Sequence, residues 1–164
     1  HPTTKLSTFE NIKSLKNLLE ALKKFENFNS IITLPANDKD SFEYIKIYNS
    51  FSKKNKNFYI FKTLGHENYI NFANYSDLII GNSSSGILEI PSLRKISINV
   101  GLRQKGRIFG NSVINVNTEK SSIIKAIKKG LSLNGDPKFI NKLKNPYGDG
   151  FASLRSHEIF KKII

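Results

Sequence analysis

Three consecutive hydroxyl side chains between two glycines form the segment of this chain best suited to chemistry. Gly81-Asn82-Ser83-Ser84-Ser85-Gly86 follows the apolar run 77–80 and leads into a segment expected to be helical as far as Pro91. Amide N–H groups at a helix start have no partner within the helix, and the helix dipole adds partial positive charge there. Glycine lets a ligand approach the backbone, and serine hydroxyls donate to phosphate oxygens. The segment therefore predicts an anion site, most naturally for a pyrophosphate, unless the serines only cap the helix.

One carboxylate follows this segment at helical spacing. Glu89 lies one turn beyond Ser85. A carboxylate in this place can complement the positive end of the helix dipole. It can equally accept hydrogen bonds from two neighbouring hydroxyls of a ribose. The spacing alone leaves both roles open.

A basic loop is expected at the same edge of the fold. Gly101-Leu102-Arg103-Gln104-Lys105-Gly106-Arg107 follows the predicted strand 95–100 and carries three cations. Arginine binds phosphate or sugar oxygens with two parallel hydrogen bonds. The loop is therefore predicted to reach over an anionic ligand, with a solvated loop as the alternative. His1 precedes a capped helix and should lie in a similar loop, although a lone histidine is more often structural than functional.

The elements that must position these residues alternate between helix and strand. Ser7 and Glu10 have the spacing of a capping box. Helices are expected over about 8–25, around 42–51, over 67–75, from the serine run to Pro91, over 120–131 and over 151–163, with strands at 30–34, 58–61, 77–80, 95–100 and 112–116. The stretch 134–149 reads as irregular turns. This alternation predicts one α/β domain, a doubly wound, Rossmann-like parallel sheet whose ligand lies at the carboxyl ends of the strands.

Composition restricts the kinds of partner. The chain has 164 residues and a formal charge of +13, but only four of its 26 basic residues are arginines, and no nucleic-acid-binding motif accompanies them. There is no cysteine, and the three histidines lack metal-ligand spacing. No apolar run approaches the roughly 18 residues of a membrane span. We therefore expect no metal, cofactor, nucleic acid or membrane partner, and a cytoplasmic location.

Four motifs together resemble a known family. They are residues 81–89, residues 98–107, the opening His1-Pro2-Thr3-Thr4 and the late Asn145-Pro146-Tyr147-Gly148-Asp149-Gly150. In their order along the chain they resemble the hydrolysing UDP-N-acetylglucosamine 2-epimerases, and the His-Pro opening favours the hydrolysing branch.

The resemblance implies the C-terminal, nucleotide-binding lobe of a two-lobed, GT-B-like enzyme. It implies that the diphosphate of UDP lies on Ser83, Ser84, Ser85 and Gly86, the ribose on Glu89, and the uracil on the backbone of Lys62-Thr63-Leu64. It further implies that Arg103 reaches the sugar or phosphates and that His1 and Arg103 support catalysis. The family has Pro-Asn-x-Asp where this chain reads Pro35-Ala36-Asn37-Asp38, so a contact there is displaced to Asn37 or lost.

The family mechanism is an elimination that expels UDP, followed by hydration to N-acetylmannosamine. Its proton-transfer carboxylates belong to the N-terminal lobe. The chain opens at His1 without an initiator Met, so we expect a fragment covering 1–164 of the C-terminal lobe, with that lobe's first strand also absent. Alternatives are the nucleotide-binding lobe of a GT-B glycosyltransferase and a stand-alone sugar-nucleotide-binding module. A homo-oligomer is possible.

Overall fold

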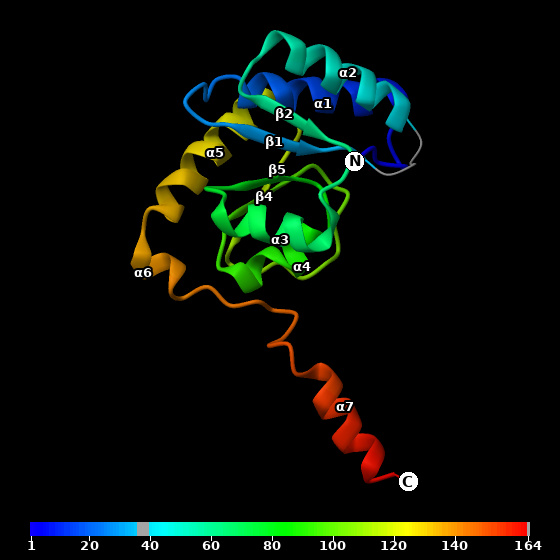
Figure 1. Cartoon of the computed structure of the whole chain (residues 1–164), viewed down its shortest axis with the longest axis vertical. Helices are drawn as coiled ribbons and strands as arrows, with labels where there is room; N and C mark the ends of the chain where they lie inside the picture. Colours follow the sequence, from blue (N-terminus) through cyan, green and yellow to red (C-terminus); the bar gives the residue numbers. More distant parts are fainter. Residues whose placement is uncertain (36–39, 164) are drawn as a thin grey trace.

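The predicted alternation of strands and helices is confirmed in the computed structural model, which describes residues 1–35 and 40–163 (Figure 1). The strands are β1 (Ser30–Thr33), β2 (Phe58–Phe61), β3 (Ile79–Gly81), β4 (Ser97–Val100) and β5 (Val113–Val116). The helices are α1 (Thr8–Leu22), α2 (Ser41–Lys54), α3 (Gly65–Tyr75), α4 (Ser85–Leu88), α5 (Lys120–Asn134), α6 (Pro137–Ile140) and α7 (Ala152–Lys161), with the 3-10 helix η1 (Ile90–Leu93). The segment 35–38, whose sequence differs from the family's Pro-Asn-x-Asp, lies largely outside the described residues. The contact expected from Asn37 therefore lies outside them too.

The capping box at the start of α1 is confirmed. The Ser7 hydroxyl accepts a hydrogen bond from the Glu10 amide at 3.2 Å, and Glu10 Oε2 accepts one from the Ser7 amide at 2.8 Å. The Ser7 hydroxyl and amide both donate to the Glu10 carboxylate, so they lower the pKa of that carboxyl group. Two otherwise unpaired helix N–H positions are thereby satisfied, which fixes where α1 begins after the His1 segment.

The five strands lie in two sheets, and within each sheet all paired strands are parallel. β1 pairs with β2, and β3, β4 and β5 pair in that order. The predicted parallel α/β architecture is confirmed, whereas the single sheet expected from the sequence is divided. Among the described residues no ladder joins β1 to β3, so β1 and β3 each have one edge without a strand partner.

Helices form a layer on each side of the strands. α1 packs against α2 and α5, while α3 and α4 pack around η1. Two apolar cores result: one centres on Ile98 and Ile123 between α5 and the larger sheet, and the other centres on Leu19 and Phe58 between α1, α2 and the smaller sheet. Leu22 packs against both cores, so α1 connects the two halves.

Two local predictions were wrong for identifiable reasons. The helix after the serine run was expected to continue to Pro91, but α4 ends at Leu88 and the chain tightens into η1. Proline has no N–H and its ring clashes with the carbonyl four residues earlier, which favours this change of helix type. The stretch 134–149 was expected to be irregular, yet it holds α6, capped by the Asp136 side chain with Pro137 at its first position.

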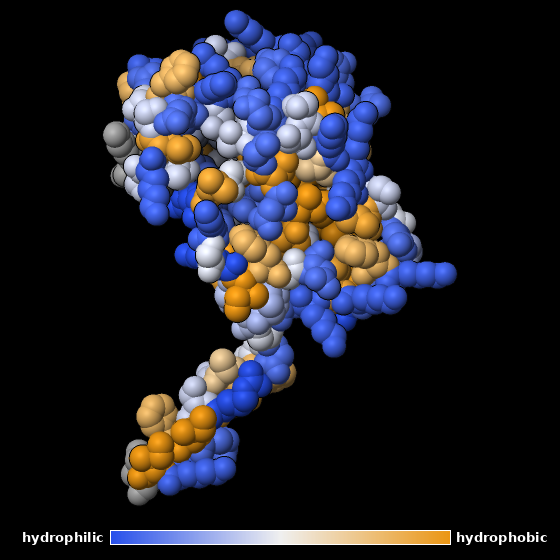
Figure 2. Space-filling view, turned by 180° about the vertical axis from the view of Figure 1, so that it is seen from behind, coloured by the Kyte–Doolittle hydropathy of each residue, from blue (hydrophilic) through white to orange (hydrophobic). Residues whose placement is uncertain are grey.

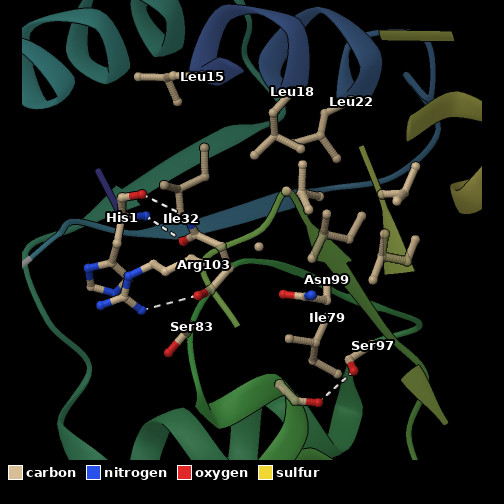
Figure 3. Close-up of a pocket in the computed structure, with 18 of the residues that line it drawn as sticks. His1, Leu15, Leu18, Leu22, Ile32, Ile79, Ser83, Ser97, Asn99 and Arg103 are labelled. Atoms are coloured by element: carbon tan, nitrogen blue, oxygen red, sulfur yellow. Dashed lines mark hydrogen bonds between the residues drawn. The ribbon is translucent and has the colours of Figure 1, made fainter. Parts of the chain in front are cut away.

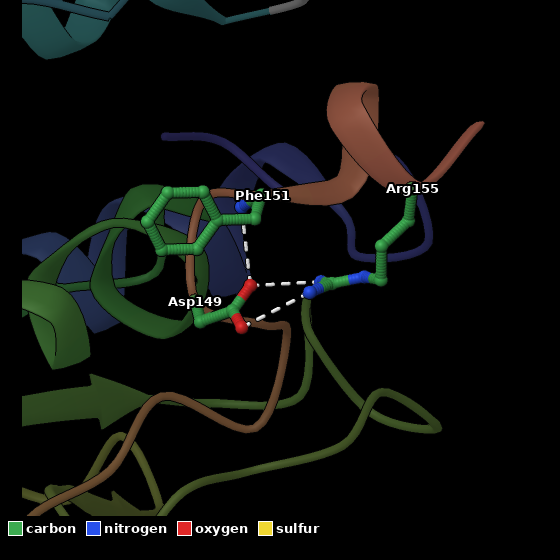
Figure 4. A network of polar contacts seen from close by, with 3 residues as sticks. All are labelled: Asp149, Phe151 and Arg155. Atoms are coloured by element: carbon green, nitrogen blue, oxygen red, sulfur yellow. Dashed lines mark hydrogen bonds and ion pairs between the residues drawn. The ribbon is translucent and has the colours of Figure 1, made fainter. Parts of the chain in front are cut away.

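The C-terminal helix extends away from the body of the molecule (Figure 1). Its start is fixed by Asp149, whose Oδ1 accepts hydrogen bonds from Arg155 Nη2 at 2.7 Å and from the Phe151 amide at 3.1 Å (Figure 4). The Arg155 guanidinium holds the pKa of Asp149 well below its usual range. All described α7 residues are exposed, and Figure 2 shows its apolar side chains on the surface. No described helix is long and apolar enough to span a bilayer.

Removal of residues 151–164 is expected to leave the free energy of unfolding unchanged within about 0.5 kcal/mol, because exposed positions contribute little to stability. Urea unfolding of the truncated and full chains, followed by far-UV circular dichroism, measures the difference. A loss above about 1 kcal/mol would mean that α7 docks onto the body in solution.

Candidate functional site

Asn82 connects three segments at the carboxyl end of β3. Its Oδ1 accepts a hydrogen bond from the His1 amino group at 2.8 Å, and its Nδ2 donates to the His1 carbonyl at 2.7 Å. Its backbone carbonyl accepts from Gln104 Nε2 at 2.7 Å. It also accepts from Arg103 Nη1 at 3.1 Å, and Figure 3 shows Arg103 beside His1 and Ser83. The opening residue, the serine run and the basic loop therefore meet at one edge, as their positions after predicted strands suggested.

The serine run turns the chain from β3 into α4. Ser84 caps α4 without a side-chain hydrogen bond, while its carbonyl accepts from the Ile87 and Leu88 amides. The Ser83 hydroxyl accepts weakly from the Ser85 amide at 3.4 Å. Because α4 has only four residues, its dipole is weaker than the sequence led us to expect. The half-buried hydroxyls, rather than a long helix dipole, are the main polar groups of this turn.

Glu89 takes part in a short hydrogen-bonded chain. Its Oε2 accepts from the Ser85 hydroxyl at 2.8 Å, and the Ser85 hydroxyl also contacts the Tyr69 hydroxyl at 2.5 Å. Burial, with the nearby Glu89 charge as a smaller cause, raises the pKa of Tyr69 despite its Ser85 contact. Glu89 ends α4 rather than lying inside a longer helix. Its carboxylate is thus held beside the serine run.

The basic loop folds back over Asn82. Gly101 has φ +81°, a left-handed conformation that glycine adopts readily, and a Cβ there would lie 3.2 Å from Thr118 Cγ2. The turn directs the following residues toward the serine run. Gln104 is 2% exposed and anchors the loop, whereas Arg103 remains exposed. Arg103 can therefore exchange its backbone contact for a ligand anion.

A cavity of about 1390 Å³ opens at this edge. Of the predicted site residues, five line it: His1, Leu64, Ser83, Gly86 and Arg103. Lys105 also lines the cavity, but Arg107 does not. Ser84, Ser85 and Glu89 are not among the lining residues. Ser85 contacts the lining residue Tyr69, and Glu89 is connected to Tyr69 through Ser85. Among the described lining residues Asp77 is the only acidic one, and it precedes β3 at the opposite end of the strand. We call the opening beside Arg103 and Lys105 the mouth of the cavity, and it is therefore positively charged.

Sequence reasoning missed several residues that shape this site. Asn82 and Gln104 stood inside the quoted motifs but were given no role, and Tyr69 was not singled out. An asparagine directly after a buried strand, where a side chain can bond to neighbouring backbone, was the available signal for Asn82. The residues that the structure describes contain no group of three or more His, Asp or Glu side chains able to hold a metal ion.

The motif at residues 145–150 stabilises the segments that surround the site. Asn145 Nδ2 donates to the Leu88 carbonyl and to the Ser92 hydroxyl, both at 2.7 Å, and so ties α4 to η1. The Tyr147 hydroxyl donates to the Ile108 carbonyl at 3.0 Å, beyond the basic loop. This motif positions the serine run and the basic loop together.

Asn145→Ala is expected to lower the free energy of unfolding by about 1–3 kcal/mol, because the partly buried Leu88 carbonyl loses its donor and the exposed Ser92 hydroxyl loses a partner. Chemical denaturation measures this change. Asn141→Ala is the control, since Asn141 is exposed and its side chain has no hydrogen bond among the described contacts. Equal stability of the two variants would contradict the anchoring role of Asn145.

The comparisons with known proteins agree on one family. The sequence matches the family model described as UDP-N-acetylglucosamine 2-epimerase over residues 1–161. Polysialic acid biosynthesis protein P7 of Escherichia coli is 35% identical over 167 residues, covering 100% of this chain and 41% of that protein. GDP/UDP-N,N'-diacetylbacillosamine 2-epimerase (hydrolyzing) of Campylobacter jejuni is 34% identical over 115 residues, covering 70% of this chain and 30% of that protein.

A solved structure supports the fold. The UDP-GlcNAc 2-epimerase of Methanocaldococcus jannaschii, in complex with UDP-GlcNAc and UDP, superposes with a TM-score of 0.68 at 19% identity. The match covers 93% of this chain and 42% of that chain. The architecture is therefore that of the GT-B-like epimerases, and this chain spans about two fifths of the length of its E. coli relative.

Proposed function

Because the chain belongs to the UDP-N-acetylglucosamine 2-epimerase family, we propose that its cavity mouth binds the UDP portion of a UDP-sugar for a hydrolysing 2-epimerase. The observation that carries this proposal is the paired donation of Arg103 and Gln104 to the Asn82 carbonyl. This contact holds a cationic loop against a turn rich in hydroxyls and leaves both facing one opening. A diphosphate has the charge and acceptor oxygens that such an opening binds.

Each candidate residue takes one part of the nucleotide. The diphosphate lies on Ser83, Ser84, Ser85 and Gly86, where hydroxyl and amide groups donate to its oxygens. The ribose hydroxyls donate to Glu89, which requires the Ser85 hydroxyl to turn from the carboxylate toward phosphate. Leu64, half-buried at the start of α3, presents its backbone to the uracil. The M. jannaschii neighbour is described as binding UDP-GlcNAc and UDP, which supports this ligand class.

The reaction proposed for the whole enzyme is elimination followed by hydration. A base removes the C2 proton, the C1–O bond breaks with its electron pair leaving on UDP, and the resulting glycal adds water with the opposite C2 configuration. The residues of this chain stabilise the charge that develops on the departing diphosphate. Arg103 supplies a cation and the serine turn supplies donors, with His1 beside them. Proton transfer belongs to a second, N-terminal lobe in this proposal.

Calorimetric titration with UDP tests the binding site directly. The expected dissociation constant is on the order of 0.1–1 mM, because one lobe provides only part of the enclosure. Gly86→Ala gives a sharp test, since a Cβ there meets only ordinary contacts with Ser97 at 3.7 Å and the fold should accept it. Gly86 lines the cavity, so the added methyl group should reduce the room for a phosphate at this turn. We expect it to weaken UDP about tenfold, or ~1.4 kcal/mol.

Gly135→Ala is the matched control, because a Cβ at Gly135 also meets only ordinary contacts and lies after α5, on no predicted ligand path. Both variants should keep the melting temperature of the parent chain. Undiminished UDP binding by a folded Gly86→Ala protein would remove the diphosphate from this turn.

A further inference from the structure

The Ser85 hydroxyl lies between two other polar side chains, and its single proton can serve only one acceptor. Its oxygen lies 2.8 Å from Glu89 Oε2 and 2.5 Å from the Tyr69 hydroxyl oxygen. An ionised carboxylate accepts hydrogen bonds but donates none, so the Ser85 proton is directed to Glu89. Tyr69 is then the donor of the second bond, and Ser85 is its acceptor. Donation therefore runs from Tyr69 to Ser85 and from Ser85 to Glu89.

Of these two bonds, only the one between Ser85 and Glu89 can be exchanged for a bond to a ligand. Burial raises the pKa of Tyr69, so the phenol keeps its proton near neutral pH and can donate to Ser85 whether or not a ligand is bound. The Glu89 amide donates to the Ser85 carbonyl at 3.0 Å, which fixes the spacing of the two residues. A phosphate at the serine turn therefore competes with Glu89 for the Ser85 proton.

Because of this competition, each half of a nucleotide binds at a cost when it binds alone. A free diphosphate that accepts the Ser85 proton leaves the half-buried Glu89 carboxylate without that donor. A nucleoside whose ribose replaces Ser85 on Glu89 leaves the Ser85 proton without an acceptor. A nucleoside diphosphate avoids both losses, because its phosphate accepts from Ser85 while its ribose donates to Glu89. A buried polar group left unpaired costs free energy, whereas the exchange of one partner for another costs little.

We propose that Ser85 couples the diphosphate and ribose subsites, so that occupation of either subsite strengthens binding at the other. The coupling favours ligands that carry both groups, the nucleoside diphosphates, over pyrophosphate or nucleosides alone. Tyr69, which lines the cavity, is a positioning residue, because its hydroxyl holds the Ser85 oxygen in place in both states. This role rests on the proposed function, because it needs a phosphate at the serine turn and a ribose at Glu89.

Calorimetric titration with pyrophosphate measures the competition in a double-mutant cycle of Ser85→Ala and Glu89→Ala. In the parent chain, Glu89→Ala is expected to tighten pyrophosphate binding about fourfold, because the Ser85 proton no longer has to leave a carboxylate. In the Ser85→Ala background the same substitution should tighten it by less than about 1.5-fold, since no such bond has to break. UDP binding should respond in the opposite direction, because Glu89→Ala also removes the ribose acceptor.

Matched controls separate this coupling from general effects on the turn. Ser132→Ala removes an exposed serine hydroxyl of α5, and the full gain from Glu89→Ala should persist in that background. Tyr69→Phe should reduce the gain, because the Ser85 oxygen is no longer held in place. Tyr75→Phe should not reduce it, since Tyr75 is 86% exposed at the end of α3.

Equal gains with and without the Ser85 hydroxyl would overturn the coupling, because the removal of a negative charge would then explain them. An unchanged pyrophosphate affinity in the folded Glu89→Ala protein would overturn it as well. Titration of the parent chain with UDP identifies a failure of the proposed function. A chain that binds UDP but shows equal gains loses only the coupling, whereas a folded chain that binds no UDP loses both.

Discussion

Glu89→Ala is expected to weaken UDP binding by about 10–150-fold, or ~1.5–3 kcal/mol, while changing the affinity for inorganic pyrophosphate far less. The estimate is that of hydrogen bonds to a charged acceptor, which two neighbouring ribose hydroxyls would make with this carboxylate. Pyrophosphate has no ribose, so its binding depends on the serine turn and Arg103 alone. Calorimetric titration of both ligands with the parent and variant chains measures the difference.

The surroundings of Glu89 make this test specific. Its carboxylate is already oriented by the Ser85 hydroxyl, which Tyr69 contacts in turn, so the variant removes an arranged acceptor rather than a mobile side chain. Glu119→Ala is the control, because Glu119 is an exposed carboxylate before α5 and on no predicted ligand path. Arg103→Ala should weaken both ligands. Unchanged UDP affinity in a folded Glu89→Ala protein would leave Glu89 as a residue that only stabilises the turn.

Local signals in the sequence predicted most elements because they act within a few residues. Ser7 and Glu10 satisfy each other's amides, so their spacing alone located the start of α1. Asp136 followed by Pro137 carried an equally local signal for α6, which we interpreted as a turn. That error came from reading an N-cap residue and a first-position proline as loop residues.

Relations between distant residues could not be predicted in the same way. The hydrogen bonds of Asn82 join residues 81 and 22 positions away, and nothing in the local sequence specifies those partners. The rule that ligands lie at the carboxyl ends of parallel strands predicted that the serine run and the basic loop share an edge. It did not predict that Glu89 would lie beside the cavity lining instead of within it. The division of the sheet likewise depends on which strands pair, a property of the whole fold.

The 164-residue chain is expected to release no measurable N-acetylmannosamine from UDP-N-acetylglucosamine, even where it binds UDP. The elimination needs a base at C2, and the described residues of the mouth provide no free carboxylate for it. Glu89 is held by Ser85 and is assigned to the ribose. Asp77 lines the cavity at the opposite end of β3. Burial raises the pKa of Tyr69, so this phenol stays protonated near neutral pH and is not a base.

Mass spectrometry of the products, with the sugar nucleotide at several times the UDP dissociation constant, measures this activity. Calorimetry on the same preparation must show UDP binding, so that missing turnover is not attributed to unfolded protein. A chain carrying the N-terminal lobe should turn over under these conditions, because that lobe would supply the proton-transfer groups and enclose the sugar. Turnover by the 164-residue chain alone, abolished by Glu89→Gln, would instead make Glu89 the base and overturn its assignment to the ribose.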